Sequence, residues 1–321
     1  MSMPLVNNPD DIKLAMIGMV EGNGHPYSWS AIINGQYDTQ VMADCGYSAI
    51  PQYLAAAGDQ LGISGAKVTH IWCDEKSDAE KVAKAAHIPF VVDNPEDVIG
   101  KVDAVIIPTD KGHEHLDRAR PFVEADLPVF IDKPLTDNEG HLQQFVRWQH
   151  DGKPIMSTSC MRYAREFGEG PDRLSELGEL RLITITTHKS WERYGIHALE
   201  GVYPFLDPGK WVSVVNTGNE QANIVHCRHE SGVDIILAAI ADMYGAFGCL
   251  NLYGTKANLS IRFKDTFYAF KAQLVGFVDY LRTGELPFEF SQTVELMKII
   301  IAGIRSREES GRVVQLKEIE S

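Results

Sequence analysis

Lys133 is the residue that the sequence places best for chemistry, within the tripeptide Asp132-Lys133-Pro134. The apolar run at 129–131 before it predicts a short buried strand that ends at Asp132. A lysine at the carboxyl end of a parallel strand lies at the edge where open α/β sheets bind ligands. Its ammonium can donate a hydrogen bond to a substrate oxygen, and it can pass a proton if its pKa is lowered. On the tripeptide alone, a surface lysine that ends a strand is the simpler interpretation. Whether Lys133 belongs to a functional site therefore depends on the segments upstream.

Those segments alternate between apolar runs and stretches of helical spacing. Strands are predicted at 12–18, 67–73, 102–107 and 129–131, and helices at 27–34, 77–87 and 113–125. Strands that alternate with helices predict the α/β class, with a doubly wound parallel sheet of the Rossmann kind.

A glycine-rich turn follows the first predicted strand, and an acid ends the second. The glycines are Gly18, Gly22 and Gly24, and the acid is Asp74. Together they form the signature of a dinucleotide site, in which a helix N-terminus meets the pyrophosphate and the acid accepts from ribose hydroxyls. The spacing departs from the usual G-x-G-x-x-G, so a longer loop is expected, and a flexible surface turn is the alternative interpretation.

Four further residues are expected to contact the cofactor. In the longer glycine loop, Asn23 or His25 would add a hydrogen bond to the phosphates. At the end of the third strand, Thr109 and Asp110 would touch the nicotinamide ribose.

The composition excludes several classes of protein. The chain has 321 residues, enough for two domains with substantial cores, and 44% of them are hydrophobic. A net charge of -14 argues against binding nucleic acid, whose phosphates it would repel. No apolar run approaches a membrane span, and the first residues lack the features of a signal peptide. Five scattered cysteines without a C-x-x-C pair suit free thiols, so a cytoplasmic location is expected. His113 and His115 do not share a helix face and no acid cluster joins them, so no metal site is predicted.

The pattern changes after Lys133-Pro134. Alternating or β-branched segments predict strands at 180–187, 222–228, 233–240, 250–253 and 257–263. A hairpin is expected at 230–232, and the whole predicts an α+β domain with a large antiparallel or mixed sheet. We therefore predict a dinucleotide-binding domain at 1–134 and a substrate-binding and oligomerisation domain at 135–321.

In the order of these features, the chain resembles the Gfo/Idh/MocA oxidoreductases over roughly residues 12–316. Asp132-Lys133-Pro134 is similar to the family's Glu-Lys-Pro motif, and 195–197 (Gly-Ile-His) to its G-x-H motif. The turn at 254–257 and the late helices resemble the family's C-terminal pattern. One position differs, because Arg193 stands where the family often has an aspartate, four residues before His197.

The resemblance implies roles for the residues near these motifs. Lys133 would orient a substrate hydroxyl, and His197 would act as the acid or base, whereas a helix-start histidine without chemistry is the alternative. Asp132 and His115 would lie near the cofactor, and a helix cap is the alternative for His115. Substrate contacts would come from a further set: Arg162, Tyr163, Trp191, Arg193 and Tyr194. A structural ion pair is the alternative for Arg162 and Tyr163. Lys189 and Trp191 could line the cleft, and a place in the core is the alternative for Trp191. Arg193 would pair with an anionic group of the substrate, or Glu192 or Tyr194 would take over the role of the missing aspartate, or dehydrogenase chemistry would be lost.

The resulting hypothesis is an NAD(P)-dependent oxidoreductase that transfers hydride between a nicotinamide and a sugar, inositol or related polyol. Asp74 favours NAD, because a 2′-phosphate would meet a carboxylate, but Lys76 nearby keeps NADP open. Two alternatives are a non-catalytic nucleotide- or ligand-sensing relative and a redox-neutral NAD-dependent glycoside hydrolase. The expected partners are a small-molecule substrate and further copies of the chain, as a homo-dimer or homo-tetramer through the C-terminal sheet, with no nucleic acid or membrane.

Overall fold

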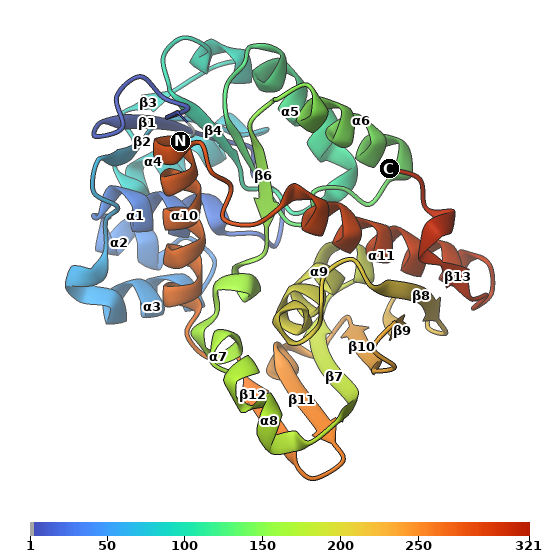
Figure 1. Cartoon of the computed structure of the whole chain (residues 1–321). Coiled ribbons are helices and arrows are strands. Elements are labelled where there is room, and N and C mark those ends of the chain that lie inside the picture. The colour runs from blue at the N-terminus through green and yellow to red at the C-terminus, as the bar shows by residue number, and fades with distance from the viewer. Residues whose placement is uncertain (1–2) are drawn as a thin grey trace.

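The computed structural model describes residues 3–321 and contains two sheets with helices packed around them (Figure 1). The first sheet has six strands in the order β3-β2-β1-β4-β5-β6, and every neighbouring pair is parallel. Its strands are β1 (Ile12–Ile17), β2 (Ala66–Trp72), β3 (Phe90–Val91), β4 (Ala104–Ile107), β5 (Val129–Asp132) and β6 (Ile155–Thr158). This is the doubly wound order, so the predicted fold class is confirmed for this half of the chain.

Helices connect these strands and cover both faces of the sheet. They are α1 (His25–Asn34), α2 (Thr39–Ala43), α3 (Ala49–Ala57), α4 (Lys76–Ala86), α5 (His115–Glu124) and α6 (Glu139–His150). Every residue of β4 and β5 is buried, which explains why these strands read as continuous apolar runs rather than alternating ones. The strand order reverses between β1 and β4, and ligands of such sheets bind outside the carboxyl ends of the strands at that point.

The first sheet extends beyond the domain boundary that we predicted after Pro134. The strand β6 pairs in parallel with β5, and α6 makes the connection between them. A sixth strand hydrogen-bonded to the sheet cannot belong to a separate folding unit, so we propose a boundary after Thr158 in place of 134.

The second sheet has seven strands in the order β12-β11-β7-β10-β9-β8-β13. Its strands are β7 (Leu180–His188), β8 (Trp211–Asn216), β9 (Ala222–His229), β10 (Asp234–Ile240), β11 (Cys249–Gly254), β12 (Asn258–Arg262) and β13 (Val314–Gln315). Only β7 and β10 pair in parallel, which confirms the predicted mixed sheet. The predicted hairpin is the turn between β9 and β10.

Helices from the C-terminal half pack against both sheets. They are α7 (Arg165–Gly168), α8 (Leu174–Leu177), α9 (Trp191–Val202), α10 (Thr266–Thr283) and α11 (Phe290–Glu308). The helix α9 packs against β7 and β10, and α11 against β8. The helix α10 instead runs beside α1 and α3, and its Phe277 stacks on Phe130 of β5 with ring centroids 5.4 Å apart (Figure 1). The two halves of the chain therefore share a packed interface.

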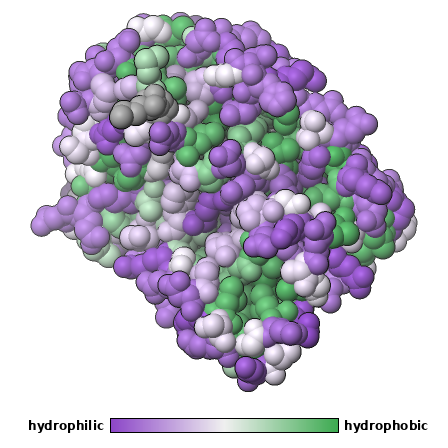
Figure 2. Space-filling model, viewed as in Figure 1, coloured by the Kyte–Doolittle hydropathy of each residue, from purple (hydrophilic) through white to green (hydrophobic). Residues whose placement is uncertain are grey.

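The other face of the second sheet is left partly open. Alternate residues of β7, β9 and β10 are buried, as expected for strands with one face on the core. The outer residues include Val212, Ile224 and Tyr253, which are more than a third exposed. In Figure 2, apolar surface is visible over the lower part of the molecule, where β7 and β11 lie. Among residues 3–321, no helix has both the length and the apolar character of a membrane span.

Candidate active site

The glycine loop leaves β1 with a backbone that only glycine tolerates well. Gly18 has φ +98°, and a Cβ built on it would lie 3.0 Å from Thr109 Cγ2. The loop ends at Gly24, after which α1 begins at His25. A Cβ at Gly24 would lie 2.6 Å from Ile50 Cδ1, so this position is also closely packed. A tight backbone turn that leads into a helix N-terminus fits the pyrophosphate of a dinucleotide, which needs exposed N–H groups at close range.

The two polar residues expected to help the loop bind phosphate are engaged within the protein. Asn23 is buried, with its amide nitrogen donating to Pro108 O (2.9 Å) and its oxygen accepting from His25 N (2.9 Å). The His25 ring bonds Asp132, with Nδ1 and Oδ2 2.8 Å apart. Asn23 therefore holds the loop against the end of β4, and His25 ties it to the end of β5, which we had not predicted for either residue.

The acid at the end of β2 is paired with an arginine that the sequence analysis missed. Asp74 Oδ1 lies 2.8 Å from Arg118 Nη2, and the same guanidinium bonds Glu114. Arg118 also lies over the Trp72 ring and 3.1 Å from a Cβ built on Gly18. The spacing of Glu114 and Arg118, four residues apart at the start of α5, was the sequence signal for this pair. Lys76 forms its ion pair with Asp93 and not with Asp74, with Nζ 2.5 Å from Asp93 Oδ1.

The His115 side chain is fully buried between the ends of β4 and β5. Its Nδ1 lies 2.8 Å from Pro134 O, and its Nε2 lies 2.9 Å from Thr109 O and 3.1 Å from the Thr109 hydroxyl. Burial lowers the pKa of His115, so one ring nitrogen donates to a carbonyl and the other can accept from the threonine. His115 thus fixes the turn after Lys133 against the end of β4.

Lys133 lies at the centre of a buried charge cluster. Its residue is 1% exposed, and Nζ lies 3.7 Å from Asp110 Oδ2 and 3.8 Å from Asp132 Oδ2. The Lys133–Pro134 bond is cis. Within residues 3–321, Lys133 Nζ and Asp110 Oδ2 have no hydrogen-bond partner although both atoms are buried. Since buried polar atoms are normally satisfied, each of these two atoms has unused hydrogen-bonding capacity.

The cluster keeps both members of the Lys133–Asp110 pair charged. Burial alone would raise the pKa of Asp110, but the charges of Lys133 and Arg193 outweigh it and lower that pKa to about 2. Burial alone would lower the pKa of Lys133, but Asp132 and Asp110 outweigh it and raise that pKa. At neutral pH Lys133 is therefore an ammonium, which can donate hydrogen bonds but cannot serve as a base.

The helix α9 brings three predicted residues to this cluster from the second domain. Arg193 Nη2 bonds Asp110 Oδ1 (2.6 Å), and the Tyr194 ring lies 4.6 Å from Lys133 Nζ. His197 is buried, with Nδ1 2.7 Å from Ser159 Oγ, and its ring lies 4.6 Å from that of Tyr194. Burial, with the charge of Lys133 as a second cause, lowers the pKa of His197 well below its ordinary value, so this ring is neutral at pH 7.

Three other residues predicted to contact substrate make contacts within the protein. Trp191 is fully buried and its Nε1 donates to Ile300 O (2.9 Å). Arg162 pairs with Glu200 and donates to Gln292 Oε1 (2.6 Å). Tyr163 packs under α10, where a Cβ on Gly276 would lie 3.0 Å from its hydroxyl. Short-range sequence gave no sign of these contacts, because each partner lies far along the chain.

Lys189 is a cluster residue that we had placed only near the cleft. Its Nζ donates to Gly22 O (2.9 Å) and to the Tyr194 hydroxyl (2.8 Å), and lies 4.3 Å from the Tyr194 ring. Its backbone has φ +60°, a left-handed conformation that residues other than glycine rarely adopt. Burial lowers the pKa of Lys189 to about 8, since its hydrogen-bond partners are neutral.

We expect Lys189→Met to change the pH dependence of stability. Because the pKa of Lys189 is about 8 in the folded chain and 10.5 ordinarily, the unfolded chain binds more protons between these values. The contribution of Lys189 to stability therefore rises with pH in that window. The gain in free energy of unfolding of Lys189→Met over the wild type should be largest at pH 7 and smaller at pH 10, measured by urea denaturation. A difference that stays constant with pH would contradict this assignment.

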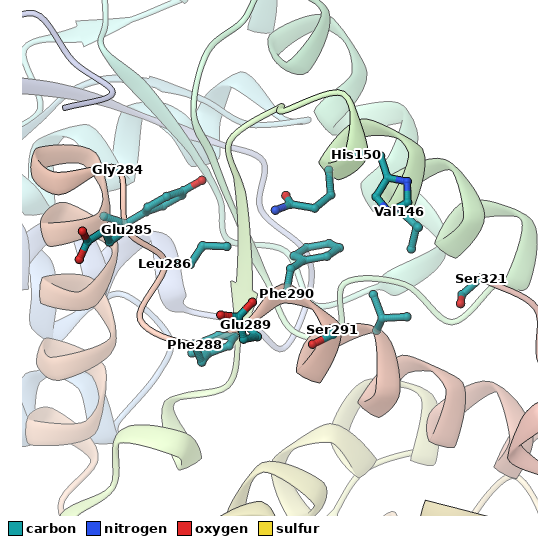
Figure 3. A pocket seen from close by; sticks show the side chains of 13 residues that line it. Val146, His150, Gly284, Glu285, Leu286, Phe288, Glu289, Phe290, Ser291 and Ser321 are labelled. Carbon is teal, nitrogen blue, oxygen red and sulfur yellow. The ribbon is translucent and has the colours of Figure 1, made fainter. Parts of the chain in front are cut away.

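A separate pocket of about 760 Å³ lies between the end of α6 and the segment that joins α10 to α11 (Figure 3). Gln149, Phe288 and Glu289 are among its lining residues, and none of the predicted site residues is. Within residues 3–321, no group of three or more His, Cys, Asp or Glu residues is arranged to hold a metal ion.

The fold and the glycine loop define an NAD-binding domain of an oxidoreductase. Residues 12–150 match the model of the oxidoreductase family with the NAD-binding Rossmann fold, Gfo/Idh/MocA. The match to this NAD-binding family model covers the first domain and confirms the resemblance and the NAD cofactor there. No curated protein matches the chain.

Solved structures match nearly the whole chain at low identity. The scyllo-inositol dehydrogenase from Lactobacillus casei with bound NAD(H) and scyllo-inositol is 14% identical, with a TM-score of 0.71 over 96% of this chain and 99% of that one. The myo-inositol dehydrogenase from Corynebacterium glutamicum is 18% identical, with a TM-score of 0.68 over 95% and 99%. The myo-inositol 2-dehydrogenase from Lactobacillus plantarum is 15% identical, with a TM-score of 0.71 over 95% and 99%. At these identities the likeness establishes the two-domain fold.

Proposed function

We propose that this protein is an NAD-dependent dehydrogenase that oxidises a CH–OH group of a polyol or sugar. The observation that carries the proposal is the Lys133 ammonium. It is buried and, among residues 3–321, lacks a hydrogen-bond partner. It lies at the end of β5 and is joined through Asp132 and His25 to the glycine loop. The match of residues 12–150 to the NAD-binding family and the structural neighbours, which are inositol dehydrogenases, support the polyol class.

In this proposal the protein needs to hold one hydroxyl and to accept one proton. When bound, NAD takes the hydride from the carbon that carries the hydroxyl. Lys133 donates a hydrogen bond to the hydroxyl oxygen and, because Asp110 and Asp132 keep it charged, it leaves the proton to another group. His197 is our candidate acceptor. With its Nδ1 directed at Ser159, its Nε2 is the nitrogen left to take the proton.

The adenosine end of the site favours NAD over NADP in this proposal. Asp74 and Glu114 bring two carboxylates to the single guanidinium of Arg118, and Lys76 is paired with Asp93. A 2′-phosphate placed near Asp74 would therefore meet an excess of negative charge.

A direct assay tests the proposal. Purified protein with NAD and a panel of polyols and sugars should form NADH, which is followed by its absorbance, and NADP should support a rate at least about 10-fold lower. Binding of NAD without oxidation of any compound would indicate a sensing role. Cleavage of a glycoside without net NADH would indicate redox-neutral chemistry. Either result would contradict the dehydrogenase proposal.

We also propose that a second copy of the chain covers the open face of the second sheet. Its exposed apolar residues Val212, Ile224 and Tyr253 support this, because such a face is unfavourable in water. We expect sedimentation of the wild type to give a dimer or tetramer, and Ile224→Lys to shift it towards the monomer. A wild-type monomer at micromolar concentration would contradict the proposal.

A further inference from the structure

The Lys133 cluster holds more cations than carboxylates. Lys133, Lys189 and Arg193 supply three positive charges, and Asp110 and Asp132 supply two negative ones. Asp110 is shared between Lys133 (3.7 Å) and Arg193 (2.6 Å), and Asp132 lies 3.8 Å from Lys133. No ion pair within residues 3–321 links Lys189 to a carboxylate, since its Nζ bonds a carbonyl and a phenol. One positive charge thus remains without a counter-charge inside this cluster.

Two donors of the cluster are unused, and two of its ammonium groups lie beside the Tyr194 ring. Arg193 Nε and Lys133 Nζ are both buried and, among the residues described, lack a hydrogen-bond partner. The ammonium groups of Lys133 and Lys189 lie 4.6 Å and 4.3 Å from the centroid of the Tyr194 ring. A partly buried cation and two unsatisfied donors are unfavourable until an anion joins them.

We propose that the substrate is a polyhydroxy carboxylic acid, such as an aldonate or a uronate, whose carboxylate is bound between Lys189 and Arg193. The inference rests on the proposed function, because Lys133 is taken to hold the hydroxyl that is oxidised. A guanidinium suits a planar carboxylate, and Arg193 can keep Asp110 through Nη2 while Nε serves the ligand. The carboxylate is unchanged in the reaction: the hydride passes to NAD and the hydroxyl proton to the base.

The cofactor is the other source of an anion near these cations. Lys189 and Arg193 donate to the carbonyls of Gly22 and Glu21, which belong to the glycine loop expected to hold the pyrophosphate. Their additional contacts with Asp110 and Tyr194, however, place them around the Lys133 ammonium, where the reacting hydroxyl would lie. The experiment therefore measures binding of NADH separately from kinetics with the substrate.

The test compares matched acids and neutral sugars as substrates with NAD: galacturonate against galactose, gluconate against sorbitol. We expect at least one acid to have a kcat/KM about 100-fold above that of its neutral partner. Lys189→Met and Arg193→Met should each raise the KM for that acid by about 10-fold or more, with little change in the Kd for NADH measured by calorimetry. Lys189→Arg, which keeps the charge, should restore most of the effect. Lys210→Met, an exposed lysine paired with Asp207, is the control.

Several results would overturn the inference while leaving the dehydrogenase proposal intact. Neutral sugars could be oxidised as well as the acids, or the two variants could weaken binding of NADH as much as they raise KM, which would assign the cations to the pyrophosphate. If no compound is oxidised, calorimetry of the acids with the NADH complex decides. Binding that is lost in Lys189→Met supports the carboxylate site although the proposed dehydrogenase fails, and the absence of binding overturns the inference.

Discussion

Lys133→Met abolishes turnover and leaves NAD binding nearly unchanged. We expect kcat/KM to fall by about 10³-fold or more, because the variant removes the one donor that holds the reacting hydroxyl and stabilises its developing negative charge. The Lys133 side chain reaches the site from the end of β5, whereas the glycine loop that faces the cofactor leaves β1, so the Kd for NADH should change by less than about 3-fold. Initial rates of NADH formation and calorimetric titration with NADH measure the two quantities.

The same substitution also removes the charge that Asp110 and Asp132 share. Breaking a buried ion cluster from one side costs about 3–5 kcal/mol, so thermal unfolding must show that the variant is folded at the assay temperature. Lys133→Arg keeps a positive charge at this position, although the guanidinium differs from the ammonium in shape and reach. This variant should fold but have a low kcat. Lys210→Met is the surface control. Full activity in a folded Lys133→Met protein would remove Lys133 from the mechanism.

Gly18→Val is expected to abolish NAD binding, with a Kd that rises about 100-fold or more. A valine at φ +98° is strained, and its Cβ would lie 3.0 Å from Thr109 and 3.1 Å from Arg118, so the loop must shift away from its present path. The backbone N–H groups would then no longer face the pyrophosphate. Calorimetric titration with NADH measures the loss.

Gly100→Val provides a matched control for this change. Gly100 has φ +80° in the same domain, and nothing lies within 4 Å of a Cβ built on it. Its substitution therefore introduces a comparable backbone strain, with a cost of about 1–3 kcal/mol, without altering the loop. If both variants lose the same affinity for NADH, the effect of Gly18→Val reflects general destabilisation and not a role in cofactor binding.

The parallel sheet and the placement of Lys133 could be predicted from local sequence. Continuous apolar runs of buried strands, glycine after β1 and acid after β2 are signals carried by a few neighbouring residues. The boundary predicted after Pro134 separates β5 from β6, because β6 is a short segment that follows a helix, and only its pairing with β5 reveals the sheet to which it belongs.

The contacts that define the site could not be predicted, because they join residues distant in sequence. Arg193 and Asp110 are 83 positions apart, and His25 and Asp132 are 107 apart. Ser159, which contacts the ring of His197, has no motif that marks it. For Trp191 the sequence left both the cleft and the core open, since a tryptophan next to site residues suits either place, and in the structure it is buried in the core.

Arg193, which stands where the Gfo/Idh/MocA family often has an aspartate, connects the two domains. Arg193 bonds Asp110 and the Glu21 carbonyl, and Lys189 bonds the Gly22 carbonyl, so the segment at the start of α9 contacts the glycine loop and the end of β4. With arginine at this position, the negative charge of Asp110 is therefore paired, and further positive charge lies beside Lys133.

The measurement that tests the central claim most directly is the formation of NADH by the purified wild-type protein and by folded Lys133→Met, with NAD and the panel of polyols, sugars and sugar acids. Our account predicts steady NADH formation with at least one compound for the wild type and a rate at least about 10³-fold lower for the variant. Equal rates for the two proteins, or no NADH from the wild type with any compound although NADH binds, would contradict it.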